Sequence, residues 1–407
     1  MNSNQFWAAA GRRLTVVTAT LILVLMFAPG AWAAKFKVLH HFTGGDGQEP
    51  RAALILDQAG NLYGTTAWGG ASGLGTVFKV TPNPDGSWAE AVLYSFTGSE
   101  GYEPWSTPVF DTAGALYGTT MYGGAYDYGT IYKLTPNPDG SWAQSVLYSF
   151  TGGADGNQPY TLAFDKTGTL YGTTWYGGTY GYGTVYTLTP NPDGSWTQSV
   201  IHSFTGGKDG AYLLRDCGLT FDSAGNFYSA AMNGGAYGYG VTFELTPKSG
   251  GGWKEKVLHA FKGHPATTPQ FAPIFDGAGN LYGTTSAGGP QDAGTIYKLT
   301  PTSDGKWIYK VIHVFNGRNG HDPLWIKFDK AGNIYGTTYW DDADGYGVVF
   351  KLAPNPDGSW KETILHRFKG SDGGQTEGLV LDAAGNLYGL TAYFGANGAG
   401  VIFEITP

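Results

Sequence analysis

The sequence predicts an all-β fold, a seven-bladed β-propeller built from four-stranded antiparallel blades. Three observations support this prediction: 66 glycines and 21 prolines interrupt the chain, one unit recurs seven times, and the two ends of the chain supply complementary parts of one unit. After the first 34 residues there is no long stretch with helical spacing, which excludes a helical bundle or a Rossmann-type enzyme. Aromatic residues make up 15% of the chain, so enough apolar surface exists for a packed core.

Residues 1–33 are expected to be a cleaved signal peptide. Two arginines, Arg12 and Arg13, precede the uncharged run 14–28, and Ala31-Trp32-Ala33 resembles a cleavage site. The alternative is a retained membrane anchor, but a Pro-Gly pair breaks the run, which is short for a ~30 Å hydrocarbon core. We therefore expect a secreted or periplasmic protein with no membrane attachment after cleavage, in which residues 34–407 form one propeller domain.

The repeat is marked by Leu-Tyr-Gly-Thr-Thr, as at Leu62–Thr66, with an Asp a few residues before it. That Asp recurs at intervals of 53 to 57 residues, a period that matches a propeller blade. In the first repeat we expect strands over residues 53–56, 61–66, 76–81 and 88–96, rich in Val, Leu, Tyr, Phe and Thr. Turns that carry Gly with Asp or Asn separate the strands, as in Asn83-Pro84-Asp85-Gly86.

The chain ends predict ring closure. The fourth-strand motif, two apolar residues, then any two residues and then Phe, occurs six times after the marker, and the seventh repeat stops after its third strand. A seventh copy, Val38–Phe42, directly follows the signal peptide. We therefore expect residues 35–42 to complete the last blade, which removes an exposed sheet edge.

These blocks, namely Asn-Leu-Tyr-Gly-Thr-Thr, Gly-Gly, Gly-Thr-Val-Phe-Lys-Leu-Thr-Pro and Val-Leu-Tyr-Ser-Phe, resemble the GloVer-type tandem-repeat family of secreted bacterial proteins. The resemblance covers about residues 35–407. It implies a propeller-like fold and export, and it implies no particular reaction.

Residues that recur in every repeat are interpreted as scaffold. The second-strand tyrosines, such as Tyr63, and the fourth-strand tryptophans, such as Trp88, are expected to pack between blades. His40, His202, His259, His313 and His366 share one outer-strand position, so they are too far apart to bind one metal ion together. The single cysteine, Cys217, is expected to be a buried, inert thiol.

One face of the ring is the predicted binding surface. In such a propeller, the loops between strands two and three and the loops after strand four open on the same side. They carry many aromatic residues beside carboxylates, a composition that suits stacking on sugar rings and also suits a protein partner. The candidate ligand-binding aromatics are Trp68, Tyr122, Trp175, Tyr176, Tyr180, Tyr237 and Trp340. Three arginines, Arg51, Arg215 and Arg318, fall on the same face and could grip an acidic sugar.

Departures from the repeat suggest specialisation. In the sixth repeat Asp341 and Asp342 replace Gly-Gly, and Asp344 follows. This acidic cluster is a candidate site for Ca²⁺, and a solvated acidic loop is the alternative. We otherwise expect no cofactor.

The sequence thus predicts a secreted, monomeric, non-catalytic binding module for a glycan or an extracellular protein. The alternative is a polysaccharide hydrolase or lyase with carboxylates at the top of the central channel, for which Asp46 and Asp372 are the first candidates. The net charge of −8 argues against a nucleic-acid partner.

Overall fold

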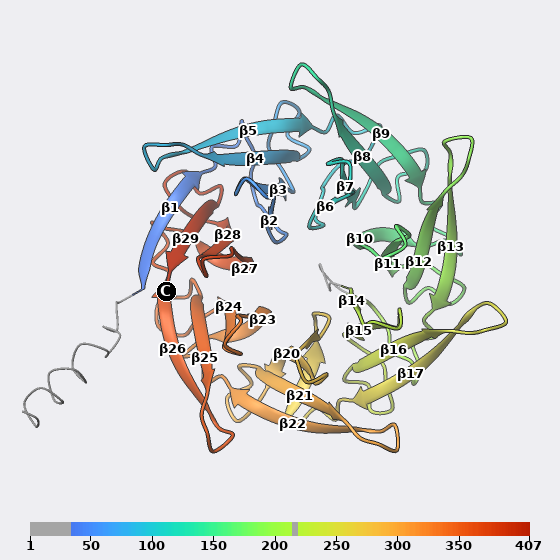
Figure 1. Ribbon diagram of the computed structural model, residues 1–407, viewed down its shortest axis with the longest axis vertical. Coiled ribbons are helices and arrows are strands. Elements are labelled where there is room, and N and C mark those ends of the chain that lie inside the picture. The colour runs from blue at the N-terminus through green and yellow to red at the C-terminus, as the bar shows by residue number, and fades with distance from the viewer. Residues whose placement is uncertain (1–33, 214–218) are drawn as a thin grey trace, which may run out of the picture.

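A computed structural model describes residues 34–213 and 219–407. The predicted signal peptide, Arg215 and Cys217 lie outside these residues. Seven β-sheets are arranged around a central axis as the blades of a propeller (Figure 1), which confirms the predicted fold. The part of the chain that the structure describes contains no helix long and apolar enough to cross a membrane.

Each blade runs from the axis outward through four strand positions. The innermost strands are β2 (Ile55–Leu56), β6 (Val109–Phe110), β10 (Asn157–Phe164), β14 (Thr220–Phe221), β18 (Ala266–Pro269) with β19 (Ile274–Phe275), β23 (His321–Phe328) and β27 (Gly374–Leu381). The second strands are β3 (Leu62–Thr66), β7 (Leu116–Thr120), β11 (Leu170–Tyr176), β15 (Phe227–Ala231), β20 (Leu281–Gly288), β24 (Ile334–Trp340) and β28 (Leu387–Tyr393). The third strands are β4 (Thr76–Pro82), β8 (Thr130–Pro136), β12 (Thr184–Pro190), β16 (Val241–Pro247), β21 (Thr295–Pro301), β25 (Val348–Pro354) and β29 (Val401–Thr406). The outer strands are β5 (Trp88–Ser95), β9 (Trp142–Ser149), β13 (Trp196–Ser203), β17 (Trp253–Ala260), β22 (Trp307–Val314), β26 (Trp360–Arg367) and β1 (Lys35–His41).

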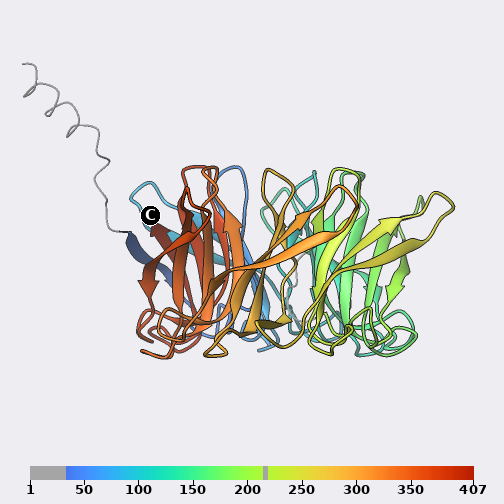
Figure 2. The ribbon, with the colours of Figure 1, turned by 90° about the horizontal axis from the view of Figure 1, so that it is seen from below.

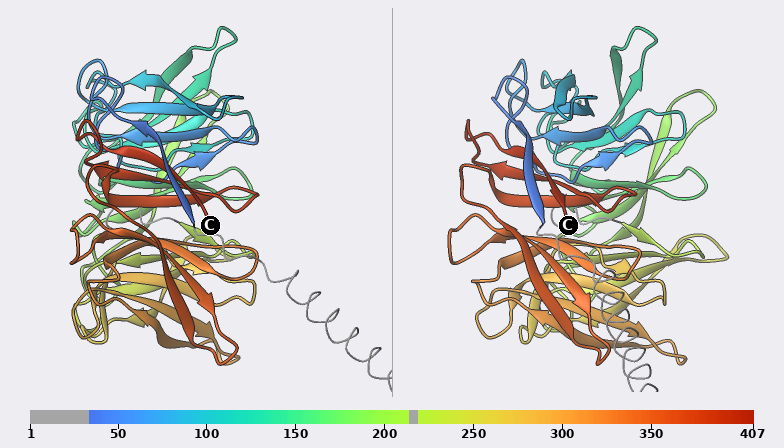
Figure 3. Two further views of the ribbon diagram at one scale, coloured as in Figure 1. Left: turned by 90° about the vertical axis from the view of Figure 1, so that its left-hand side faces the viewer. Right: turned by 60° about the vertical axis from the view of Figure 1, so that its left-hand side comes forward.

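Strand β1 closes the ring as predicted. It pairs antiparallel with β29, so that Lys35 lies opposite Thr406 and Val38 lies opposite Phe403. Figures 1 and 3 show this first strand beside the last strands of the chain. The seventh blade is therefore assembled from both ends of the described chain, and no covalent bond secures it.

The innermost strand of the first blade is shorter than the sequence predicted, because it begins at Ile55 rather than at residue 53. The backbone N–H of Ala53 donates to the hydroxyl of Thr107 in the second blade, at 2.9 Å, instead of joining the ladder of its own sheet. A bond between blades thus replaces a bond within the blade.

The contacts between neighbouring blades, here called seams, repeat one aromatic arrangement seven times. At each seam the Phe that follows an outer strand packs edge-on against a third-strand aromatic ring of the next blade, with ring centroids 5.1 to 5.3 Å apart. Phe42 and Phe78 make this contact at the seam between the seventh and the first blades, here called the closing seam, and both rings are fully buried. The closing seam is therefore packed like the other six.

Gly64 in the marker motif makes room for this packing. A Cβ at that position would lie 2.5 Å from the Phe78 ring. The second-strand tyrosines and fourth-strand tryptophans also pack between blades as predicted. For example, Tyr63 contacts Phe110 of the next blade edge-on, and Trp88 contacts Tyr388 of the preceding blade.

Candidate functional site

The loops predicted to form one face lie side by side. Gln48, in the loop after an outer strand, exchanges two backbone hydrogen bonds with Trp68, in the loop between second and third strands, at 2.8 and 3.0 Å. Tyr102 and Tyr122 pair in the same way in the second blade. Figure 2 shows these loops along one edge of the ring and the long hairpins along the opposite edge. We call the first of these edges the loop face.

Seven residues with left-handed backbone conformation surround the axis on the loop face. They occupy one position in each repeat, near the start of the innermost strand, and φ lies between 54° and 59°: Glu49, Glu103, Gln158, Tyr212, Thr268, Asp322 and Gln375. Each backbone N–H donates to a carbonyl in the loop between second and third strands of the preceding blade. This set, here called the mouth ring, thus links adjacent blades. Non-glycine residues at positive φ carry backbone strain and often mark functional positions.

Arg51 is held at the mouth ring by carboxylates from two blades. Its guanidinium pairs with Glu49 at 3.0 Å and with the buried Glu377 at 3.8 Å. It also donates to the hydroxyls of Tyr339, at 3.3 Å, and Tyr393. Burial alone would lower the pKa of Arg51, but Glu377 and the tyrosines raise it above its ordinary value. Arg51, a predicted ligand-binding residue, is therefore already engaged within the protein.

Glu103, a buried member of the mouth ring, has a perturbed ionisation. Burial and, to a lesser extent, the nearby Glu49 raise its pKa to about 7, while Arg51 acts in the opposite direction. A carboxyl group with a pKa near neutrality can act as a general acid or base.

Six tyrosines form an exposed surface on the second, third and fourth blades. They occupy two equivalent positions in the loops between second and third strands, two residues apart: Tyr126, Tyr180 and Tyr237 at the first, here called the outer position, and Tyr128, Tyr182 and Tyr239 at the second, here called the inner position. The outer three are 52% to 58% exposed. In the other blades the outer position carries Ser72, Gln291, Asp344 and Asn397. We call these six residues the tyrosine surface.

Aromatic contacts continue from the tyrosine surface toward the mouth ring. Tyr182 packs against Tyr212, which packs against Tyr176 with centroids 5.5 Å apart. Tyr176 stacks on Trp175 at 4.9 Å, and Trp175 contacts the buried Tyr160. These ring contacts connect the exposed Tyr182 with the buried Tyr160.

The other predicted ligand-binding residues are distributed around the loop face. Trp68 and Tyr122 are half-buried, and Tyr122 stacks on Tyr102 at 5.3 Å. Trp340 is exposed and belongs to the sixth blade, and Arg318 is exposed. The tyrosine surface therefore includes Tyr180 and Tyr237 from the predicted set, but not Trp340.

The two carboxylates proposed for hydrolysis lie in different seams. The Asp46 carboxylate lies 3.0 Å from Nε2 of His40, and the Asp372 carboxylate lies 2.9 Å from Nε2 of His366, so each can accept a hydrogen bond from its histidine. Among the described residues, no hydrogen bond or ion pair joins Asp46 to Asp372. Each of the two carboxylates thus pairs with a different histidine.

The acidic cluster of the sixth blade forms a local turn. The Asp341 side chain is buried, accepts hydrogen bonds from the backbone N–H groups of Ala343, Asp344 and Gly347, and pairs with Arg367 at 2.9 Å. Asp342 and Asp344 are exposed. The Asp341 carboxylate therefore stabilises the turn and forms an ion pair with Arg367.

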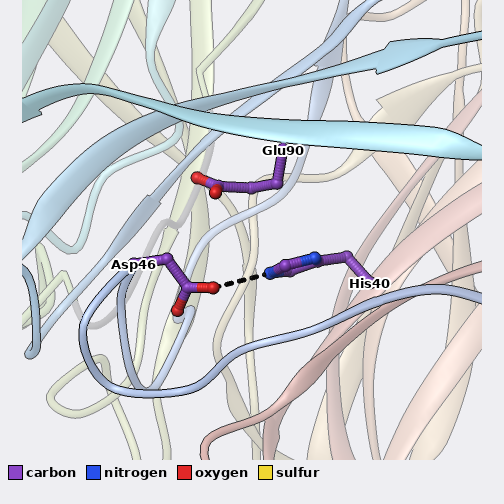
Figure 4. Close-up of side chains that lie close together, drawn as sticks. All are labelled: His40, Asp46 and Glu90. Carbon is purple, nitrogen blue, oxygen red and sulfur yellow. Dashed lines mark hydrogen bonds and ion pairs between the residues drawn. The ribbon is translucent and has the colours of Figure 1, made fainter.

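A group suited to a metal ion lies instead at the closing seam. His40, Asp46 and Glu90 offer one nitrogen and two carboxylate oxygens, all within 4.8 Å of one another (Figure 4). The sequence analysis identified the histidine position but not its partner Glu90. The sequence contained a signal for this pairing. At two other seams a Glu also lies two positions after the fourth-strand tryptophan, and the outer strand of the preceding blade carries His.

The centre of the ring encloses a cavity of about 270 Å³. Mainly apolar side chains of the inner blade positions line it, including Leu54, Val109, Leu162, Phe271, Ile326 and Leu379. Among the described residues, the polar side chains that line it are Thr107, Thr161, Thr220, Thr284 and Lys327.

Several solved structures are similar to this fold. The extracellular domain of the one-component system BT4673 from B. thetaiotaomicron matches with a TM-score of 0.57 and 13% identity, covering 92% of this chain and 42% of that one. The extracellular domain of the hybrid two-component system BT3049 from the same organism matches with a TM-score of 0.52 and 13% identity, covering 91% and 41%. PorZ, a surface component of the type-IX secretion system of Porphyromonas gingivalis, matches with a TM-score of 0.52 and 14% identity, covering 90% and 47%. The chain thus spans less than half the length of these proteins, and the likeness shows the fold.

Sequence comparison identifies the family. No curated protein matches the chain in sequence. The family model described as the Gloeobacter/Verrucomicrobia repeat matches residues 27–220 and again residues 216–407, which together span all seven blades. The chain therefore belongs to the Gloeobacter/Verrucomicrobia repeat family.

Proposed function

We propose that this protein is a secreted or periplasmic, non-catalytic binding module that holds a glycan on the tyrosine surface of its loop face. The observation that carries the proposal is the confinement of six exposed tyrosines to three consecutive blades. The buried tyrosines of the second strands, by contrast, recur in all seven repeats, and the inner position carries one further tyrosine, the half-buried Tyr346 of the sixth blade. These six rings are therefore candidates for recognition.

The chemistry of these side chains supports a carbohydrate ligand. A tyrosine presents a flat apolar face for stacking on a sugar ring and a hydroxyl for hydrogen bonding. Three neighbouring blades repeat the same pair of rings, which suits a ligand that itself consists of repeated units. Extracellular domains among the structurally similar proteins are consistent with a role outside the cytoplasm. An extracellular protein is the other class of ligand that such a surface can hold.

The first blade provides the design of the test. Substituting Tyr126, Tyr180 and Tyr237 by Ser copies Ser72, so the loops should keep their conformation. We expect the wild-type protein to bind a subset of a glycan array and the triple variant to lose those signals. Trp340→Ala, on the sixth blade, serves as the control and should retain them. The wild type could instead give no signal on the array and capture a protein from the native host that the triple variant does not capture. This result would indicate that the ligand is a protein and not a glycan. Unchanged array binding by the triple variant would refute the tyrosine surface as the site.

A second candidate function, polysaccharide hydrolysis or lysis, is favoured by one observation, the raised pKa of Glu103 beside Glu49 and Arg51. It predicts the release of reducing ends or unsaturated products from a polysaccharide. This release should be lost in Glu103→Gln and kept in Asp46→Asn and Asp372→Asn, whose carboxylates pair with histidines in separate seams.

A further inference from the structure

The closing seam carries a histidine and two carboxylates from three separate segments. His40 belongs to β1, Asp46 to the loop that follows it, and Glu90 to β5 of the first blade (Figure 4). Their ligand atoms lie within 4.8 Å of one another, and this is the one group of three such ligands in the described parts of the chain. All three residues are half-buried, so water and ions can reach them.

We propose that these residues bind a divalent transition-metal ion such as Zn²⁺, which fastens the strand that closes the ring to the first blade. One imidazole nitrogen and two carboxylate oxygens are ligands that Zn²⁺ accepts, with a remaining position for water. Binding would replace the contact between His40 and Asp46, 3.0 Å apart, by bonds from both side chains to the ion.

The electrostatics of the seam favour a cation. The Oε1 atom of Glu90 is buried and has no hydrogen-bond partner. Among the described residues, no lysine or arginine forms an ion pair with Glu90, and burial together with the nearby Asp46 raises the pKa of Glu90 to about 7. A bound cation would neutralise both carboxylates and give Glu90 a partner.

The ligands are held in place by contacts outside the cluster. Asp46 accepts hydrogen bonds from the backbone N–H of Thr43, at 2.8 Å, and from its hydroxyl, at 3.0 Å. The His40 ring packs edge-on against the fully buried Phe42, with centroids 5.1 Å apart. Such supporting contacts orient metal ligands and reduce the cost of binding.

The other seams show a correlated change at the same two positions. Where the outer strand carries His, two further seams carry Glu in the next blade, namely His202 with Glu255 and His313 with Glu362. Where the outer strand carries Tyr, the next blade carries Gln, namely Tyr94 with Gln144 and Tyr148 with Gln198. At the last two seams the histidine stacks on an aromatic ring, His259 on Tyr309 and His366 on Phe36. Ligand-capable His and Glu thus occur together, and Asp209 adds a third such group near His202. The seams with Tyr and Gln lack the His and Glu and provide an internal comparison.

The test is titration of the chelator-treated, full exported chain with ZnCl₂ by calorimetry, together with thermal unfolding with and without Zn²⁺. We expect one tight equivalent of Zn²⁺ and a higher unfolding temperature in its presence. Glu90→Gln should weaken the tight binding by about tenfold or more and abolish the thermal shift. The double variant His40→Tyr, Glu90→Gln copies the seam of Tyr94 and Gln144, so it should fold and also lack the tight site.

The control is Glu255→Gln, the same substitution at the seam of His202, where the histidine lies 3.5 Å from Asp209. It should retain the tight equivalent. The proposal is overturned if the wild type binds no Zn²⁺, if Glu90→Gln binds as tightly as the wild type, or if Glu255→Gln removes the same equivalent.

Discussion

Replacement of Phe42 by Ala tests whether the first strand is an integral part of the ring. The Phe42 side chain is completely buried and packs edge-on against Phe78, with centroids 5.2 Å apart. Its core cluster includes Leu54 and Leu62 of the first blade and Ile402 of the last. Removing a buried phenylalanine ring costs about 3–5 kcal/mol through lost burial and the remaining cavity.

Phe96→Ala is the matched control, because Phe96 makes the same contact with Tyr132 at an ordinary seam, at 5.1 Å, and is equally buried. The backbone is matched too, since the N–H groups of Phe42 and Phe96 donate to Gly400 and Gly75 at 3.1 and 3.0 Å. If the closing strand is integral, equilibrium unfolding by denaturant should give both variants losses of about 3–5 kcal/mol. A loss below about 1 kcal/mol for Phe42→Ala alone would show that residues 35–42 are a loosely attached arm, and would refute the reasoning.

Three further predictions concern the seams and the mouth ring. Folding raises the pKa of Glu103 from 4.5 to about 7, so its neutral form stabilises the native state below pH 4.5 and this contribution is lost as the pH rises to 7. Glu103→Gln should therefore flatten the dependence of the unfolding free energy on pH across this interval, and an unchanged profile would contradict the assignment. Gly64→Ala places a Cβ 2.5 Å from the Phe78 ring and should cost about 1–3 kcal/mol in denaturant unfolding, whereas a neutral result would mean that the ring has room to move. Arg51→Met removes the ion pair between Arg51 and the buried Glu377 and should cost about 3–5 kcal/mol, part of which Glu377→Gln in the same chain should restore. If Glu377→Gln restores none of the lost unfolding free energy, the loss comes from the other contacts of Arg51.

The repeat itself made the architecture predictable. Equivalent residues recur at a fixed interval, so each blade could be aligned on the others, and the displaced copy at Val38–Phe42 predicted closure by β1. The interpretation of Tyr63 and Trp88 as packing between blades rested on the same alignment and is confirmed by their ring contacts.

The candidate site was less predictable, because it depends on which blades become neighbours and how side chains turn. Arg51 was identified on the loop face, but its partner Glu377 comes from another repeat and occupies no marked motif. Glu90 was missed because its partner His40 lies on the strand that closes the ring. The alignment treated each repeat separately, whereas these sites form between repeats.

The most direct test of the proposed binding surface is oxidative footprinting of the tyrosines with and without a glycan selected on the array. Protection should fall on Tyr126, Tyr180 and Tyr237, whose side chains are exposed in the free protein, and should not fall on the exposed Trp340 of the sixth blade. Equal oxidation of these three tyrosines in the free and bound protein, with protection elsewhere on the ring, would contradict the account.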